Sequence, residues 1–327
     1  MKEQFSTGAH AVSDPAEFPD LVAPVWEVVH DQLDSGTYEG KFDFATDGVS
    51  VCYHEQLSRR VRVRGAMAPG LVGFAMADGI CREQGRWWGR SHPVGGMPFM
   101  GPANRELDIV FPAGGHKRVV VMSADVFRES YSSLSGRDPR FLDSGAHFLN
   151  LSMTAQVRIW RRLKAMLEHA NKGGSFTPNE LVEIFVDACP DNNPALHLGP
   201  SRAKHLVHRV MELAEESSFT LSVADLCVLL RASKRTVEYA FRDYLGVSPY
   251  ALLQRHRLNK CRRQLLAADP GTTTVHQVSN ALGFRDSGRF AALYRQYFAE
   301  LPSATLARAA SDALRLPGFS APRRKLG

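Results

Sequence analysis

The side chains that carry most metal and nucleophilic chemistry are scattered along this sequence rather than clustered. His54, His92 and His116 stand singly, whereas a metal site in a small β barrel needs a tight His-x-His and a following carboxylate, so that the ligands converge. The five cysteines form no Cys-x-x-Cys pair and leave one over, which favours reduced thiols. No Gly-x-Ser-x-Gly elbow or Cys–His pair at a recognisable spacing occurs. The sequence therefore predicts no catalytic residue, no metal and no cofactor, and it disfavours an enzyme.

The net charge of the chain is negative in the first part and positive in the second. Residues 1–200 carry 20 Lys and Arg against 24 Asp and Glu, whereas residues 201–327 carry 20 against 10. This asymmetry indicates that a polyanionic partner, if there is one, binds the second part. The length of 327 residues suits two domains, and the hydrophobic fraction of 44% is sufficient for two cores. No window approaches the ~18 apolar residues of a membrane span, and residues 1–20 lack a secretory signal, so we expect a cytoplasmic protein without a membrane partner.

One helical pattern occurs twice in the C-terminal part. A short helix over 223–230, with apolar residues three and four positions apart, is followed by a break and by a second helix that Ser233 would cap. The same order returns after Val278, with Gly283-Phe284 as the break and Asp286 or Ser287 as the cap. Five positions correspond at a constant spacing of 53 residues: Val237, Phe241, Arg242, Leu245 and Pro249 match Phe290, Tyr294, Arg295, Phe298 and Pro302. A short helix, a tight turn and a second helix make a helix-turn-helix, which the sequence predicts twice.

The segment between the two units predicts one helix from Pro249 to Ala267. Its polar positions are basic, namely Arg255, Arg257, Lys260, Arg262 and Arg263. A helix of about 18–20 residues rises roughly 27–30 Å, close to the roughly 34 Å of one duplex turn. Such a basic rod could hold two recognition helices in successive major grooves on one face of DNA.

Residues 202–310 resemble the tandem helix-turn-helix module of AraC/XylS-type transcription regulators. The strongest match is Val278-Ser279-x-x-x-Gly283-Phe284 followed by Phe290, Tyr294, Phe298 and Pro302, and it is supported by Ser233-x-Arg235-Thr236-Val237, Phe241, Gly246-x-Ser248-Pro249 and Arg257-Leu258. Arg231 and Ala299 replace usual glycines at helix ends, and Ala292 stands where a polar residue is common, which implies fewer polar contacts from the second unit. Leu226-Cys227 and Arg257-Leu258-Asn259 are also similar to the ethanolamine-operon regulator branch.

The resemblance implies the residues that bind DNA. Base contacts would come from Lys234, Arg235, Thr236, Glu238 and Tyr239 in the first unit and from Ser287, Gly288 and Arg289 in the second, with Asp286 as the cap. Arg235 suits guanine O6 and N7, and Glu238 suits cytosine N4. Phosphate contacts would come from Arg242, Arg255, Arg257 and Arg295. For each of these side chains, a solvated helix face is the alternative. The resemblance further implies double-stranded DNA and RNA polymerase as partners and an activator more than a repressor.

Residues 1–190 predict an effector-sensing and dimerisation domain. We expect a helix over 21–33, then short strands over about 41–124 that form an antiparallel barrel or sandwich, then helices over about 152–188. The linker falls at 191–201, the DNA-binding domain at 202–310, and a mobile basic tail at 311–327. The expected fold is thus a two-domain α+β protein, with a cupin-like antiparallel β domain flanked by helices and an all-α tandem helix-turn-helix domain.

Aromatic residues are the candidates for an effector pocket inside the β domain. They are Phe42, Phe44, Tyr53, Trp87 and Trp88, and for each of them a place in the core is the alternative. Adjacent tryptophans on a strand face opposite sides, so we expect Trp87 and Trp88 not to share a core.

The helix over 152–170 carries Val157, Trp160, Leu163 and Leu167 opposite a basic face. It forms either a homodimer contact, as the resemblance implies, or a cover on the sheet. The sequence thus favours a ligand-responsive regulator, with a DNA-binding protein whose N-terminal domain only oligomerises or contacts a protein as the alternative.

Overall fold

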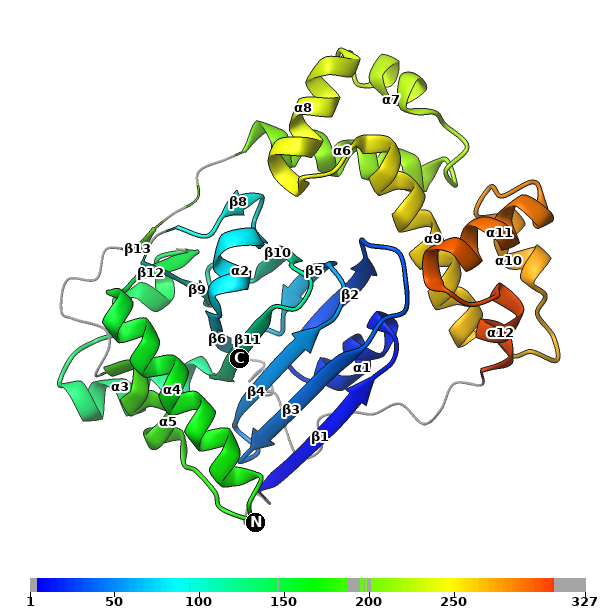
Figure 1. Cartoon of the computed structure of the whole chain (residues 1–327). Helices are drawn as coiled ribbons and strands as arrows, with labels where there is room; N and C mark the ends of the chain where they lie inside the picture. The colour runs from blue at the N-terminus through cyan, green and yellow to red at the C-terminus, as the bar shows by residue number, and fades with distance from the viewer. Residues whose placement is uncertain are drawn as a thin grey trace, which may run out of the picture.

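The computed structural model describes residues 5–93, 95–145, 147–186, 195–196, 198 and 201–308. The basic tail expected at 311–327 and most of the expected linker lie outside these residues. Within them, an N-terminal β domain lies against a C-terminal helical domain (Figure 1). No helix of the described residues is both long and apolar enough to cross a membrane.

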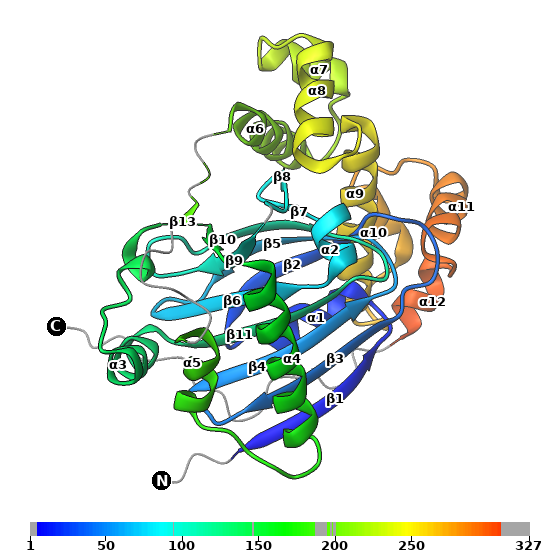
Figure 2. The ribbon, with the colours of Figure 1, turned by 60° about the vertical axis from the view of Figure 1, so that its left-hand side comes forward.

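Two antiparallel sheets form the β domain, with an apolar core between them (Figure 2). In spatial order the larger sheet contains β1 (Ser6–Val12), β3 (Gly40–Thr46), β4 (Ser50–Leu57), β11 (His116–Ser123), β6 (Leu71–Ala77), β9 (Gly96–Met100), β12 (Phe148–Asn150) and β13 (Ala195–Leu196). The smaller sheet contains β2 (Trp26–Gln32), β5 (Val61–Met67), β10 (Glu106–Phe111), β7 (Arg86–Trp87) and β8 (Arg90–Ser91). This arrangement confirms the predicted sandwich of short antiparallel strands.

Helices cover the outer face of the larger sheet. They are α3 (Ala124–Ser135), α4 (Met153–Ala170) and α5 (Pro178–Val186), and they share a second core with that sheet. In α4, Leu163 and Leu167 are buried and Trp160 packs under the guanidinium of Arg118, 3.8 Å from its ring centroid. Cover of the sheet, one of the two alternatives for this helix, is therefore realised by these residues. Shorter helical segments are η1 (Pro15–Glu17), α1 (Phe18–Val22), α2 (Gly79–Gln84) and η2 (Arg140–Asp143).

The helix expected over 21–33 is wrong. Only α1 is helical there, and residues 26–32 form β2, which pairs with β5 from Trp26 opposite Met67 to Gln32 opposite Val61. The apolar residues at helical spacing, Val22, Val25, Trp26 and Val29, combine the end of α1 with β2, in which Trp26 is buried and Val29 is half-buried. Long-range pairing with β5 outweighs this local periodicity, because a strand can bury alternate residues only beside a partner.

The two tryptophans also depart from expectation. Trp87 and Trp88 are 3% and 4% exposed, belong to one core cluster and have ring centroids 6.4 Å apart. Trp88 follows the end of β7 with φ of +49°, so the alternation of a strand does not apply to it. Its indole N–H donates to the Glu106 carbonyl at 2.7 Å, which fixes its ring in the core.

The C-terminal domain contains the two predicted helix-turn-helix units. Its helices are α6 (Arg202–Glu216), α7 (Val223–Leu229), α8 (Lys234–Leu245), α9 (Pro249–Ala267), α10 (Val275–Ala281), α11 (Ser287–Phe298) and α12 (Pro302–Ala307). Ser233 caps α8 by accepting from the N–H of Thr236, and Asp286 caps α11 by accepting from the N–H of Arg289. The constant spacing of 53 residues thus reflects two structural repeats.

The C-caps of α8 and α11 are equivalent positions with different residues. Gly246 has φ of +71° and Ala299 has φ of +59°, so both adopt the left-handed conformation. Because Cβ makes this conformation unfavourable by about 1–2 kcal/mol, Ala299→Gly is expected to raise the free energy of unfolding by about 0.5–1 kcal/mol. Gly246→Ala is the matched opposite change and should lower it by a similar amount. Urea unfolding of both variants tests this, and a destabilised Ala299→Gly protein would contradict it.

Candidate nucleic-acid interface

The first unit exposes most of the side chains that were predicted to contact bases. Lys234, Arg235, Thr236 and Tyr239 are exposed on α8 and Glu238 is half-buried. The Arg235 guanidinium lies 5.4 Å from the Tyr239 ring centroid and donates to its hydroxyl at 3.4 Å, so the two side chains stand together on the surface. Val237 and Phe241 face the core on the other side of the helix.

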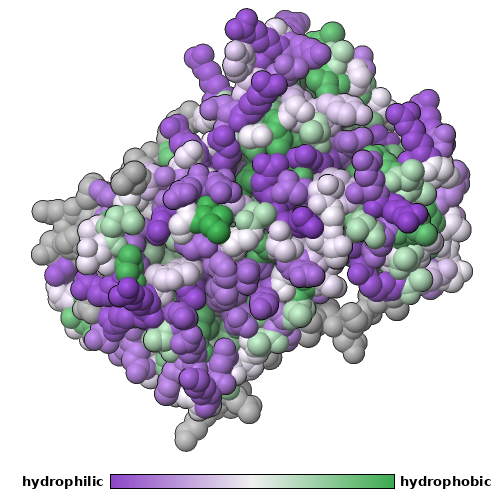
Figure 3. All heavy atoms as spheres, in the orientation of Figure 1, coloured by the Kyte–Doolittle hydropathy of each residue, from purple (hydrophilic) through white to green (hydrophobic). Residues whose placement is uncertain are grey.

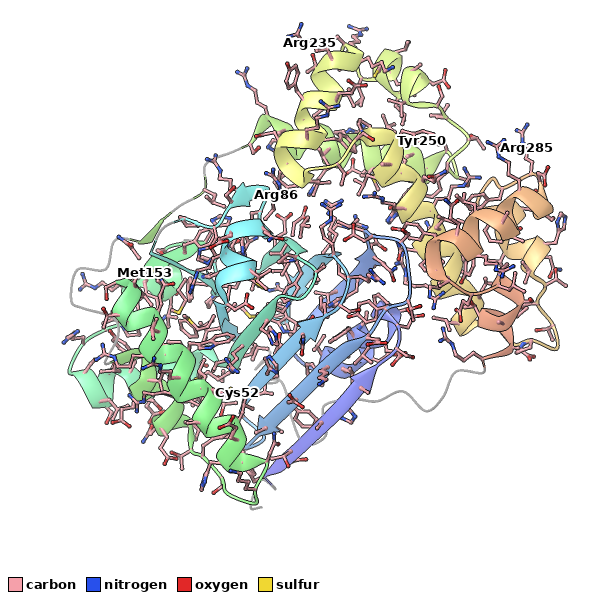
Figure 4. All side chains as sticks on the ribbon, viewed as in Figure 1. Cys52, Arg86, Met153, Arg235, Tyr250 and Arg285 are labelled. Atoms are coloured by element: carbon pink, nitrogen blue, oxygen red, sulfur yellow. The ribbon has the colours of Figure 1, made fainter. Side chains whose placement is uncertain are left out.

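The second unit is exposed in the same way. Ser287, Gly288 and Arg289 are exposed in the first turn of α11, whereas Phe290 and Tyr294 are buried. Arg285, which sequence reasoning did not select, is exposed just before the cap of this helix. Figure 4 shows Arg235 and Arg285 at the edge of the molecule turned away from the β domain, with Tyr250 between them. Figure 3 shows largely hydrophilic side chains over this edge.

The predicted phosphate-binding arginines fall into two groups. Arg242 and Arg295 are exposed, near the C-terminal ends of α8 and α11. Arg255 and Arg257 are half-buried, and the Arg257 guanidinium lies 3.6 Å from the Phe284 ring centroid. Burial lowers the pKa of Arg257. The first pair is therefore freely available to a ligand, and the second pair is held within the domain.

A groove of about 550 Å³ lies between the two units. Its wall includes Lys234 and Glu238 from α8, Tyr250 and Arg257 from α9, and Phe284 from the turn before α11. Tyr250 is 66% exposed, so its ring stands in the space between the two recognition helices. A duplex that contacted both helices would run across this groove. Sequence reasoning missed Tyr250 because its position in α9 follows the N-cap and carries no basic or repeated pattern.

Known proteins resemble this C-terminal part of the chain. Residues 226–308 match a family model described as a helix-turn-helix domain. The probable thc operon regulatory protein of Rhodococcus erythropolis is 36% identical over 86 residues, which cover 26% of this chain and 26% of that protein. The XylDLEGF operon transcriptional activator 1 of Pseudomonas putida is 30% identical over 109 residues, or 33% of each protein. The chain thus spans between a quarter and a third of the length of these relatives.

The C-terminal domain is thus similar to the helix-turn-helix domains of proteins named as transcription regulators, and it is called the AraC/XylS-type domain here after the resemblance given above. Among solved structures, a transcriptional regulator from Chromobacterium violaceum, described as a protein that contains an AraC-type DNA-binding domain, is 26% identical, with a TM-score of 0.31, over 34% of this chain and 96% of that one. The narrower similarity to ethanolamine-operon regulators stays a prediction.

The AraC/XylS-type domain packs its back against the smaller sheet of the β domain. Strand alternation places Val28, His30, Val63 and Ile109 on the inner face of this sheet, at a cavity. Of the residues that alternate with them, Asp31, Arg64 and Asp108 contact the helices on the outer face, and Arg62 pairs with Asp108. Leu33 and Val110 join the core of the AraC/XylS-type domain. One face of this sheet therefore forms the wall of a cavity, and the other face is the surface against which the DNA-binding domain packs.

Asp31 is the centre of the first polar contact across this domain interface. It is 3% exposed, and its carboxylate contacts His256 Nδ1 at 2.7 Å, Arg64 at 3.3 Å and Arg263. His256 Nε2 contacts Glu215 at 2.8 Å. His256 thus lies between two carboxylates, one from each domain. Burial alone would raise the pKa of Asp31, but the charges of His256 and Arg263 hold it well below its usual range.

Two arginines of the predicted basic rod are used in this interface. Arg262 is 6% exposed and its guanidinium pairs with Asp14 and, at 2.8 Å, with Glu300. Arg263 pairs with Asp31. These two basic residues of α9 therefore face the β domain, and neither was among the predicted phosphate contacts. The acidic β domain neutralises them, which the opposite charges of the two parts of the chain explain.

The second polar contact is made by backbone and amide groups. Asn259 accepts from the N–H of Gln32 and donates to its carbonyl, both at 2.9 Å, and the Tyr297 hydroxyl donates to the same carbonyl at 2.8 Å. The N–H of Gly36 donates to the Tyr297 carbonyl at 2.8 Å. These bonds hold the end of β2 to α9 and to the second unit at once.

The pairing of Glu215 with His256 predicts a dependence of stability on pH. The hydrogen bond from His256 lowers the pKa of Glu215 to about 2. Because the folded pKa is depressed, the stabilisation is present above the unfolded value of about 4.3 and is lost as the pH falls towards 2. Glu215→Gln should therefore reduce the loss of unfolding free energy between pH 5 and pH 2.5. The effect should be modest because the Glu215 side chain is 38% exposed.

Urea unfolding at a series of pH values measures this change. In a His256→Phe background, Glu215→Gln should alter the pH dependence much less, because only the contact with Lys260 at 3.6 Å is then left. An unchanged slope in the single Glu215→Gln variant would contradict the pairing.

The interior of the β domain contains a small cavity of about 30 Å³. Of the predicted effector-pocket residues, Tyr53 and Trp87 line it. Phe42, Phe44 and Trp88 are buried in the surrounding core and do not line it. Sequence reasoning missed His30, Glu55 and Lys117, which bring charge to the cavity wall, because each looks like an ordinary polar residue of an exposed strand face.

Two histidines that were expected to stand alone are in contact. His54 Nε2 lies 3.0 Å from His116 Nδ1, and Asp43 contacts the other ring nitrogen of His54 at 3.3 Å. They meet because β4 and β11 are paired neighbours, although their positions in the sequence are far apart. Within the part of the chain that the structure describes, no group of three or more His, Cys, Asp or Glu could hold a metal ion.

Proposed function

We propose that this protein is a ligand-responsive transcription regulator that reads two successive major-groove segments of double-stranded DNA. The observation that carries the proposal is the exposure of two recognition helices on the face turned away from the β domain, while the other side of α9 is used in the domain interface. The α9 helix of 19 residues spans about 28 Å, which is compatible with one turn of duplex. A cytoplasmic location follows from this function.

The proposed base contacts are those predicted from the resemblance. Lys234, Arg235, Thr236, Glu238 and Tyr239 would read one segment, and Ser287, Gly288 and Arg289 the next; Arg242, Arg255, Arg257 and Arg295 would contact phosphate. The exposure of Arg242 and Arg295 supports their role directly. For Arg255 and Arg257 the proposal requires that a guanidinium leave its half-buried place when DNA binds.

The experiment selects DNA from a random library with the full-length protein and then maps protection of the selected site. Each protomer should protect two successive helical turns, about 20 base pairs on one face. Protection of a single turn, or no selection of any sequence, would overturn the proposal.

A small-molecule effector in the β domain and RNA polymerase as a protein partner complete the proposed mechanism. Activation is favoured because one relative of the AraC/XylS-type domain is named as a transcriptional activator. If metabolites that bind the β domain never alter DNA binding or transcription, the sensor role fails. The alternative, an N-terminal domain that only oligomerises or contacts a protein, then takes its place.

Dimerisation through α4 is the specific form of oligomerisation that we propose for the N-terminal domain. Met153 is 50% exposed and Val157 is 40% exposed, and both border a shallow depression on this helix with Arg161. A second copy of the chain would cover these apolar side chains. Sedimentation of Val157→Glu against the wild type tests it, since a dimer that rests on this face should dissociate.

A further inference from the structure

The cavity in the β domain contains an ionic group that a purely apolar core would not need. Glu55 on β4 pairs with Lys117 on β11 at 2.9 Å and lies 3.7 Å from His30 Nε2 on β2. The three side chains are between 3% and 6% exposed. Trp26, Tyr53 and Trp87 form aromatic walls around them. Buried charges of this kind are costly unless they are paired and hydrogen-bonded.

Three polar atoms on residues that line this cavity lack a hydrogen-bond partner. They are His30 Nδ1, Glu55 Oε1 and Trp87 Nε1, and each is shielded from solvent. Buried polar groups are nearly always satisfied by protein, water or a bound molecule. Trp87 Nε1 can only donate, Glu55 Oε1 accepts when ionised, and His30 Nδ1 can do either. A molecule that satisfied them would need both an acceptor and a donor.

The charge of the cavity wall determines which molecules fit. Burial alone would raise the pKa of Glu55, but its surroundings, first of all the charge of Lys117, outweigh burial and lower the pKa to about 2, so the carboxyl is ionised near neutral pH. Burial lowers the pKa of His30, which favours its neutral form. Glu55 and Lys117 therefore balance each other. An ionised guest would leave one uncompensated charge away from water, whereas a neutral guest would not.

We propose that this cavity binds a small neutral molecule with a hydrogen-bond acceptor next to a donor, of which a primary amide is the simplest example. Its carbonyl would accept from Trp87 and its amino group would donate to Glu55, two of the residues whose polar atoms lack a partner. The volume of about 30 Å³ admits two or three water-sized groups, which limits the guest to a few heavy atoms. That this guest is the effector rests on the proposed function; the binding itself does not.

The test titrates the full-length protein with three probes of two or three heavy atoms: formamide, formate and methylammonium. Tryptophan fluorescence reports binding, since Trp26 and Trp87 line the cavity. At pH 7 and constant ionic strength, formamide should bind at least tenfold more tightly than either ion. Equal or tighter binding of an ion, or no saturable change with formamide up to 100 mM, would overturn the proposal.

Charge variants make the test sharper. Glu55→Gln leaves Lys117 without its anion and should shift the preference to formate, and Lys117→Gln should shift it to methylammonium. Trp87→Phe removes the indole N–H and should weaken formamide binding several-fold, even if the charge variants fail to fold. Unchanged selectivity in the variants that fold would overturn the proposal. The DNA selection described above is run without any probe, so failure of DNA binding and failure of amide binding are separate results.

Discussion

Replacing Asp108 by alanine is expected to lower the free energy of unfolding by about 3–5 kcal/mol. Asp108 and its partner Arg62 have side chains only 3% and 2% exposed, and Arg62 donates two hydrogen bonds to it, at 2.9 and 2.7 Å. The Tyr244 hydroxyl donates to the same carboxylate at 2.9 Å, and His208 contacts it at 3.4 Å. Alanine would leave the Arg62 charge buried without an anion and would remove a contact between the domains.

Urea unfolding at neutral pH measures this loss. The double variant Asp108→Ala with Arg62→Met should recover a large part of the stability, because no unpaired charge is left. Asp138→Ala is the matched surface control: its partner Arg128 and Asp138 itself are 37% and 56% exposed, so the loss should stay within about 1 kcal/mol. A similar loss in both alanine variants would contradict the buried role of Asp108.

Replacing Arg235 by alanine should weaken binding to the selected DNA site by about 1–3 kcal/mol. The loss of sequence discrimination should be confined to one base pair, because a guanidinium that donates two hydrogen bonds to guanine discriminates against other bases at that position. Arg235 is exposed in α8 and Tyr239 contacts its guanidinium, so the side chain is already partly ordered before DNA binds. Truncation therefore removes a positioned contact.

Competition binding on the selected site and its single-base variants measures the change. Arg242→Ala is the matched control: it also removes one exposed arginine from α8, but it should weaken all sequences alike and reduce the salt dependence by about one phosphate contact. Equal losses on selected and random DNA for Arg235→Ala would show that this residue contacts phosphate instead.

The elements that local signals determine were predictable from the sequence. Caps such as Ser233 and Asp286 and the repeat of apolar residues define the ends and faces of α8 and α11, and the structure contains both. Residues 26–32 were not predictable in this way, because a strand depends on a partner elsewhere in the chain. The same reason hid the contact between His54 and His116, which only the pairing of β4 with β11 brings together.

Much of the proposed DNA-binding surface could be predicted from the sequence, whereas the interface between the two domains could not. The exposed residues of α8 follow from its helical period and its cap. By contrast, Asp31 and Asp108 look like solvated charges in alternating strands, and only the packing of the second domain buries them. The same packing turns Arg262 of α9 inward to Asp14.

His30 and Asp31 are neighbours in the chain, yet one faces the cavity and the other faces α9. A conformational change caused by a molecule in the cavity would thus need to cross only the thickness of a single β sheet to reach α9. It would travel sideways through the backbone of β2 rather than along the segment that joins the two domains. The length and composition of that segment could then vary without affecting this coupling. A shift of β2 by one residue would instead exchange the faces of His30 and Asp31 and abolish the coupling.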